Sequence, residues 1–159
     1  MHRDRTRKRI ISWIGSLVSR LYISNANPFG YTYYSYPYQA TASTATLTMA
    51  FEQDPSFWCL DDISVALQTG GPNLVVDPGF ESGALGSYIS CNPSGASSSG
   101  TVSTTCPNSG WYSYYDGSIG NPDFLSQSFF VTSGSVYIVS FWLENVGATP
   151  NSATIIMSE

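Results

Sequence analysis

The chain has 159 residues, of which 42% are hydrophobic and 14% aromatic, while only 11% are charged. All six Lys and Arg residues fall within the first 20 positions, so residues 21–159 carry ten acidic side chains and a formal charge of −10. A body without cations excludes nucleic acid and anionic membrane as favourable partners. The single histidine, His2, lies in the basic tail, which excludes histidine-based catalysis and His-rich metal sites in the body of the chain.

Residues 1–20 form a basic tail with two interpretations. MHRDRTRKR precedes the short apolar stretch IISWIGSLV, which is the order of segments in a secretory signal peptide, but Asp4 and Arg20 interrupt that pattern. The tail is therefore either the remnant of a signal or an extra strand. No other apolar run reaches the roughly 18 residues of a membrane span, so no span is predicted.

Beyond the tail, apolar and polar residues alternate with the period of strands. The expected strands are Ser35–Ala40, Thr46–Phe51, Leu60–Ala66, Asn73–Val76, Leu125–Val131, Val136–Leu143 and Ala153–Met157. We expect the first two to form a hairpin, and the third and fourth to pair across the linker 68–72. Short strands separated by Gly, Pro, Asn and Ser clusters predict an all-β fold, either a sandwich or a jelly roll.

The chain has three cysteines, and their positions suggest one disulfide. Cys91 and Cys106 flank a flexible Gly, Ser and Thr-rich stretch, so we expect them to form a disulfide in an oxidising compartment. Two free thiols in a loop are the alternative. Cys59 lies within an expected strand and is predicted to be a buried free thiol.

Two motifs carry a family resemblance. FEQDPSFWCLDDISV (51–65) resembles the closing strands of a galactose-binding-domain-like jelly-roll module, a class that includes many carbohydrate-binding modules. NLVVDPGFESG (73–83) resembles the opening strand of the same kind of module. The closing motif comes first here, which reverses the usual order.

That reversal leaves two alternatives open. Residues 21–67 are the C-terminal strands of one module and 73–159 the N-terminal strands of the next, or the two pieces close as one circularly permuted jelly roll. Closure covers strand edges that soluble proteins do not leave exposed. Closure within one chain and a strand-swapped homodimer meet this need equally well.

The resemblance also implies a structural Ca²⁺ ion. Asp61 and Glu81 match the family's ligand positions, and a backbone carbonyl near Gly79 would complete the set, because calcium prefers carboxylate and carbonyl oxygens. The expected side-chain alternation places Asp61 on the same strand face as Ile63 and Val65, where an unpaired charge would be costly. The alternative is that Asp61 caps a turn and Glu81 is solvated.

An aromatic cluster is the candidate ligand site. Its expected members are Trp111, Tyr112, Tyr114, Tyr115, Asp116 and Asn121. Sugar rings stack on aromatic planes, and carboxylate or amide groups bind their hydroxyls, so the cluster favours a neutral glycan; packing against neighbouring strands is the alternative use of these aromatics. The expected function is a secreted, non-catalytic carbohydrate-binding module. The alternatives are a structural or adhesive repeat without a ligand, and a fragment of a glycoside hydrolase.

Overall fold

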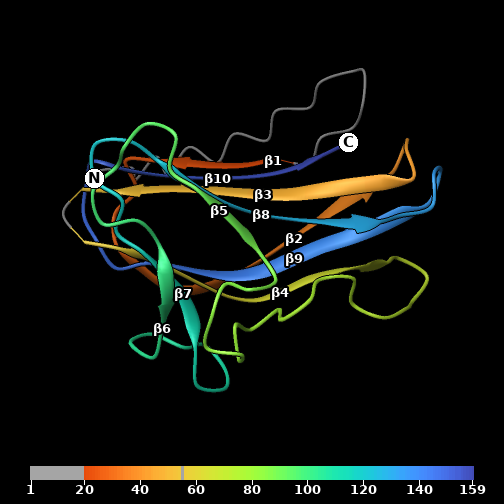
Figure 1. The fold of residues 1–159 in the computed structure, drawn as a ribbon, viewed down its shortest axis with the longest axis horizontal. Coiled ribbons are helices and arrows are strands. Elements are labelled where there is room, and N and C mark those ends of the chain that lie inside the picture. Colours follow the sequence, from red (N-terminus) through yellow and green to blue (C-terminus); the bar gives the residue numbers. More distant parts are fainter. Residues whose placement is uncertain (1–19, 55) are drawn as a thin grey trace, which may run out of the picture.

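The computed structural model describes residues 20–54 and 56–159, which form two antiparallel five-stranded sheets packed face to face (Figure 1). Sheet A has the order β1 (Arg20–Ser24), β10 (Asn151–Ser158), β3 (Thr44–Gln53), β8 (Asp123–Phe130) and β5 (Ile89–Cys91). Sheet B has the order β2 (Phe29–Gln39), β9 (Val136–Asn145), β4 (Trp58–Leu67), β7 (Ser113–Asp116) and β6 (Thr101–Ser103). The predicted all-β sandwich is confirmed. The predicted signal or strand at residues 1–19 lies outside the described residues.

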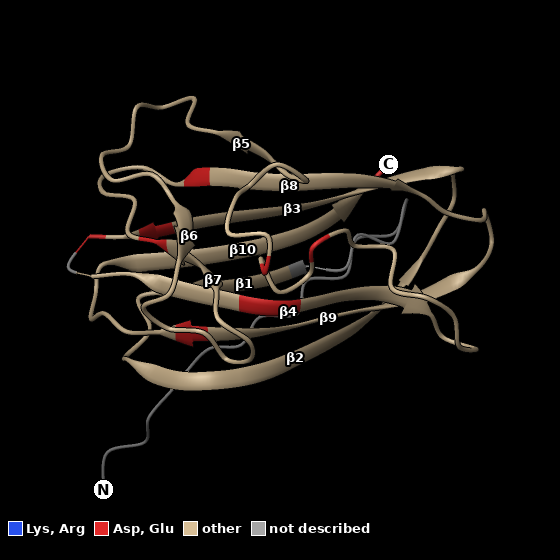
Figure 2. Cartoon of the chain, turned by 60° about the horizontal axis from the view of Figure 1, so that its bottom comes forward, with Lys and Arg blue, Asp and Glu red and all other residues tan. Residues whose placement is uncertain are grey.

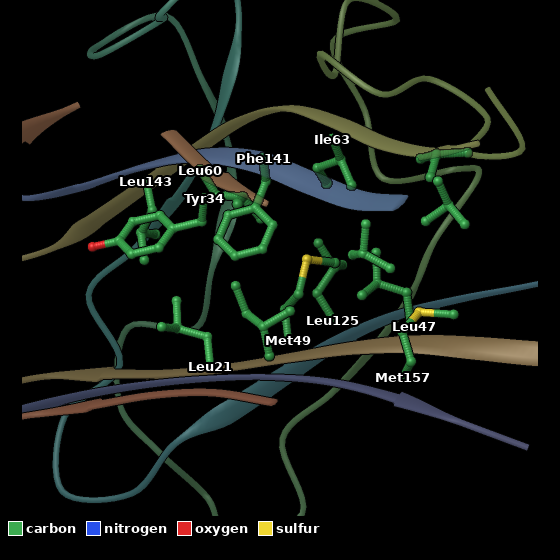
Figure 3. Close-up of a cluster of buried hydrophobic side chains, with 14 of the residues drawn as sticks. Leu21, Tyr34, Leu47, Met49, Leu60, Ile63, Leu125, Phe141, Leu143 and Met157 are labelled. Carbon is green, nitrogen blue, oxygen red and sulfur yellow. The ribbon is translucent and has the colours of Figure 1, made fainter. Parts of the chain in front are cut away.

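One apolar core fills the space between the sheets. Alternate residues of the long strands point into it, as the labelled side chains of Figure 3 show for both layers. Leu47, Met49 and Leu125 enter from sheet A, and Leu60, Phe141 and Leu143 from sheet B, all fully buried. No helix within the described residues has the length and apolar character to cross a bilayer.

Consecutive long strands alternate between the two sheets, so the predicted hairpin is wrong. β2 pairs with β9 in sheet B, whereas β3 pairs with β10 and β8 in sheet A. The short connection at residues 40–43 therefore carries the chain from one layer to the other. Side-chain alternation is the same in a hairpin and in such a crossover, which is why the pattern located both strands but not their partners.

Strands from both parts of the chain build both sheets. β1 to β4 come from residues 20–67 and β5 to β10 from residues 89–158, and the two groups interleave in each layer. At one edge β1 pairs with β10, so that Leu21 lies opposite Ile155. The two parts of one chain thus pair with each other in both sheets, and a strand-swapped homodimer stays a prediction.

Residues Asn73–Val76 do not form the predicted strand. Asn73 binds the β4 backbone with its side chain: its Oδ1 accepts from the Val65 amide at 2.9 Å and its Nδ2 donates to the Ile63 carbonyl at 2.8 Å. Three residues on, the Gln127 side chain of β8 binds both the amide and the carbonyl of Val76. The segment therefore crosses from one sheet to the other, and the partners of β4 are β9 and β7.

A bulge in β4 reverses the expected orientation of Asp61. Asp62 has a φ of 51°, and the register with β9 shifts between Asp61 and Ser64. Because of this extra residue, Leu60 and Ile63 both face the core. Asp61 consequently lies on the opposite face from Ile63, towards the outer surface of sheet B.

Candidate functional site

A disulfide fastens the loop 104–112 to the outer face of sheet B. Cys59 of β4 is bonded to Cys106, and Cys91 is the free, exposed cysteine. The predicted Cys91–Cys106 pair and the predicted free thiol at Cys59 are therefore both wrong. Cys91 lies opposite Phe124 in sheet A, whereas Cys106 lies beside sheet B, so the sandwich separates the two sulfurs.

The two adjacent acids of β4, which form a single band in Figure 2, hold the same loop. Asp61 Oδ2 accepts hydrogen bonds from the backbone amides of Asn108 at 2.8 Å and Ser109 at 3.1 Å. Asp62 accepts from the Asn108 side-chain amide and the Ser109 hydroxyl. Burial raises the pKa of Asp61 to about 6, although the backbone amides oppose that shift.

Glu81 holds the far end of the loop. Its carboxylate accepts from the Trp111 amide at 3.0 and 3.1 Å and from the Tyr112 amide at 3.1 Å. Gly110 permits this contact, because it has a φ of 62° and a Cβ there would lie 2.2 Å from Glu81 Oε1. Together with the disulfide and the two aspartates, Glu81 fixes the loop along its length.

The predicted calcium ligands do come together, but their oxygens face hydrogen-bond donors. A Cβ on Gly79 would lie 3.4 Å from Asp61 Oδ1 and 3.7 Å from Glu81 Cγ, which puts the three residues side by side. Asp61 accepts from three backbone amides and Glu81 from two. Among the described residues, no group of three or more His, Cys, Asp or Glu side chains is arranged around a cation. As arranged, these residues hold a loop and do not fit calcium, whose presence stays a prediction.

The predicted glycan platform divides between two environments. Trp111 is 77% exposed, and Tyr112 beside it is half-buried. Tyr114 and Asp116 are 1% and 0% exposed and face the core, so neither can contact a ligand as predicted. Tyr115 lies on the outer face of sheet B with its ring against Phe57, and the Asn121 side chain donates to the Ser94 carbonyl. Alternation along β7 explains the division.

Asp116 forms a buried acid pair with Asp123 of β8. Burial raises the pKa of Asp116, and the adjacent Asp123 raises it further. Tyr114 donates to Asp116 Oδ2 at 3.3 Å, and the Gly100 amide donates to Asp123 Oδ2 at 2.8 Å. Both carboxyls are sealed inside the sandwich, so this pair does not have the open cleft that glycoside hydrolysis requires.

A second exposed aromatic group lies on the outer face of sheet B. Tyr33 of β2 is 53% exposed and lies opposite Trp142 of β9, with ring centroids 5.4 Å apart. In the sequence, the tyrosine-rich run at residues 31–36 indicates an aromatic surface. Its side chains alternate between the two faces of β2, so that Tyr34 faces the core and Tyr33 faces outward.

Comparison with known proteins finds no match: no family model, no curated protein and no solved structure matches this chain.

Proposed function

We propose that this protein is a secreted, non-catalytic module that binds a neutral glycan, with Trp111 as the stacking surface. The exposure of Trp111 carries the proposal. An isolated indole that is 77% exposed has no packing role, and large aromatics combine an apolar face with low conformational freedom.

The surroundings of Trp111 favour binding, because its loop is already ordered. The Cys59–Cys106 disulfide anchors one end, and the Glu81 carboxylate holds the amides of Trp111 and Tyr112. A residue that is fixed before binding loses less entropy when a ligand arrives. Tyr112, the next residue, is half-buried and packs against the core cluster, which helps to hold the loop.

Charge selects a neutral ligand. The chain has no Lys or Arg after Arg20, and three of its acids surround the Trp111 loop. A sulfated or phosphorylated glycan would meet like charge there with no ion pair to offset it. The disulfide supports the proposed extracellular location, since such bonds persist in oxidising compartments.

A glycan array with the parent protein and Trp111→Ala tests the proposal. We expect binding to neutral glycans that is lost in the variant. Phe130→Ala is the matched control, because Phe130 is 84% exposed at the end of β8 in the other sheet. Binding restricted to anionic glycans, or equal binding by parent and Trp111→Ala, contradicts the proposed mode. No binding to any glycan favours the structural or adhesive repeat.

A further inference from the structure

A pocket of about 330 Å³ opens beside the edge of sheet B formed by β6 and β7, away from the Trp111 loop. Four segments meet there: the turn between β3 and β4, the chain entering β6, β7 itself and the chain leaving β7. The lining side chains used below are Asp54, Ser56, Ser98, Thr101, Tyr115 and Ile119. Thr101 and Tyr115 are direct partners in the β6–β7 ladder, so a regular sheet forms the floor.

The pocket offers hydrogen-bonding groups that the fold leaves unused. Within residues 20–54 and 56–159, the hydroxyls of Ser56, Ser98, Thr101 and Tyr115 make no hydrogen bond to another described residue. Asp54 Oδ1 accepts from the Gly120 amide at 2.9 Å, and Asp54 Oδ2 has no such donor. One free carboxylate oxygen among hydroxyls suits a ligand that brings several hydroxyl groups of its own.

One wall of the pocket is apolar and held in place. The Tyr115 ring packs against Phe57 with centroids 4.1 Å apart, and Ile119 is 44% exposed. A backbone bridge joins Ile119 to Ser97, with the Ile119 amide donating to the Ser97 carbonyl at 2.9 Å. The wall therefore exists without a ligand, as is usual for small-molecule sites.

We propose that this pocket is a subsite for a single neutral sugar residue, recognised by Asp54 and the surrounding hydroxyls and stacked against Tyr115. A volume of about 330 Å³ lies at the low end for ligand pockets, which fits one sugar ring. The absence of Lys and Arg from residues 21–159 disfavours an anionic occupant. The inference rests on the proposed glycan-binding function and deepens it. It adds a second site near the C-terminal end of β7, whereas Trp111 precedes the N-terminal end of that strand.

Backbone and indole NMR on the intact ¹⁵N-labelled protein separates the two sites. The probes are neutral methyl glycosides of glucose, galactose, mannose and xylose at millimolar concentration. We expect at least one of them to shift the amide signals of Thr101, Gly117 and Ile119. Thr101→Val removes one hydroxyl that can hydrogen-bond to the sugar, and Asp54→Asn removes the negative charge of the carboxylate. Each variant should weaken the binding of the glycoside by about tenfold.

Thr48→Val on the outer face of sheet A is the matched control and should leave the titration unchanged, because Thr48 lies in the opposite layer. Shifts confined to the Trp111 indole would overturn the pocket but keep the proposed function. The absence of shifts at the pocket amides with all four glycosides would also overturn it. Equal affinity in parent, Thr101→Val and Asp54→Asn would show that the pocket side chains do not make the contacts.

Discussion

Removing the Cys59–Cys106 disulfide tests the pairing and the stability that it provides. The bond joins residues 47 positions apart, and closing a loop of that length restricts the unfolded chain by about 4 kcal/mol on the chain-entropy model. The alternative pair expected from sequence, Cys91–Cys106, closes a much shorter loop and would contribute about 3 kcal/mol. A domain of this size has a total free energy of unfolding of roughly 5–15 kcal/mol, so either loss is large.

The assay is urea unfolding of the parent, Cys106→Ser and Cys91→Ser without reductant. We expect Cys106→Ser to lower the free energy of unfolding by about 4 kcal/mol and to steepen the urea dependence, because the unfolded chain becomes less compact. Cys91→Ser is the matched control. Cys91 is exposed and unbonded, so its replacement should change stability by less than about 0.5 kcal/mol. Equal losses in the two variants, or a loss below about 1 kcal/mol in Cys106→Ser, would refute the reasoning.

Three further predictions follow from the buried and loop-holding carboxylates. The folded state raises the pKa of Asp116 and so binds its proton more tightly than the unfolded chain does; the melting temperature should therefore fall as pH rises above the usual range of an Asp pKa, and Asp116→Asn should flatten that dependence. A flat profile in the parent would contradict the buried acid pair. Gly110→Ala should displace Glu81 and loosen the Trp111 loop, seen as a lower heteronuclear NOE at the Trp111 amide, whereas Gly86→Ala, where a Cβ meets nothing within 4 Å, should not. Finally, EGTA should leave the melting temperature unchanged, because backbone amides occupy the Asp61 and Glu81 oxygens; a drop would instead establish the calcium implied by the family resemblance.

Side-chain alternation located the long strands but not their neighbours. The predicted strands Thr46–Phe51 and Val136–Leu143 fall within β3 and β9. This is because a strand with one buried face alternates apolar and polar residues along the sequence. Pairing is a property of the whole chain, and both a hairpin and a crossover fit the same alternation. Short strands such as β5 and β6, with three residues each, contain too little alternation to be recognised.

The sequence predicts some individual residues of the candidate site, but not which of them lie together in the fold. Trp111 is exposed, as a stacking residue must be, but the strand period of β7 sends Tyr114 into the core and separates it from its predicted partners. One inserted residue in β4 turned Asp61 from the core face to the outer face. Asp54 stands in the sequence Asp-Pro-Ser, which is typical of a turn, and nothing local shows that the distant hydroxyls of Ser98 and Thr101 line the same pocket.

The strand order has a consequence for how the chain folds. β10 lies between β1 and β3, and β9 lies between β2 and β4, although both are synthesised after the strands that they separate. The strands of neither sheet can all pair until β9 and β10 are in place. Folding therefore depends on contacts between residues far apart in the sequence, and it should be slow. Until then, β1 to β4 have open edges that another chain could occupy. The same geometry makes the protein a candidate for complementation, in which a separate peptide covering β9 and β10 restores the sandwich to a chain that ends near Gly134.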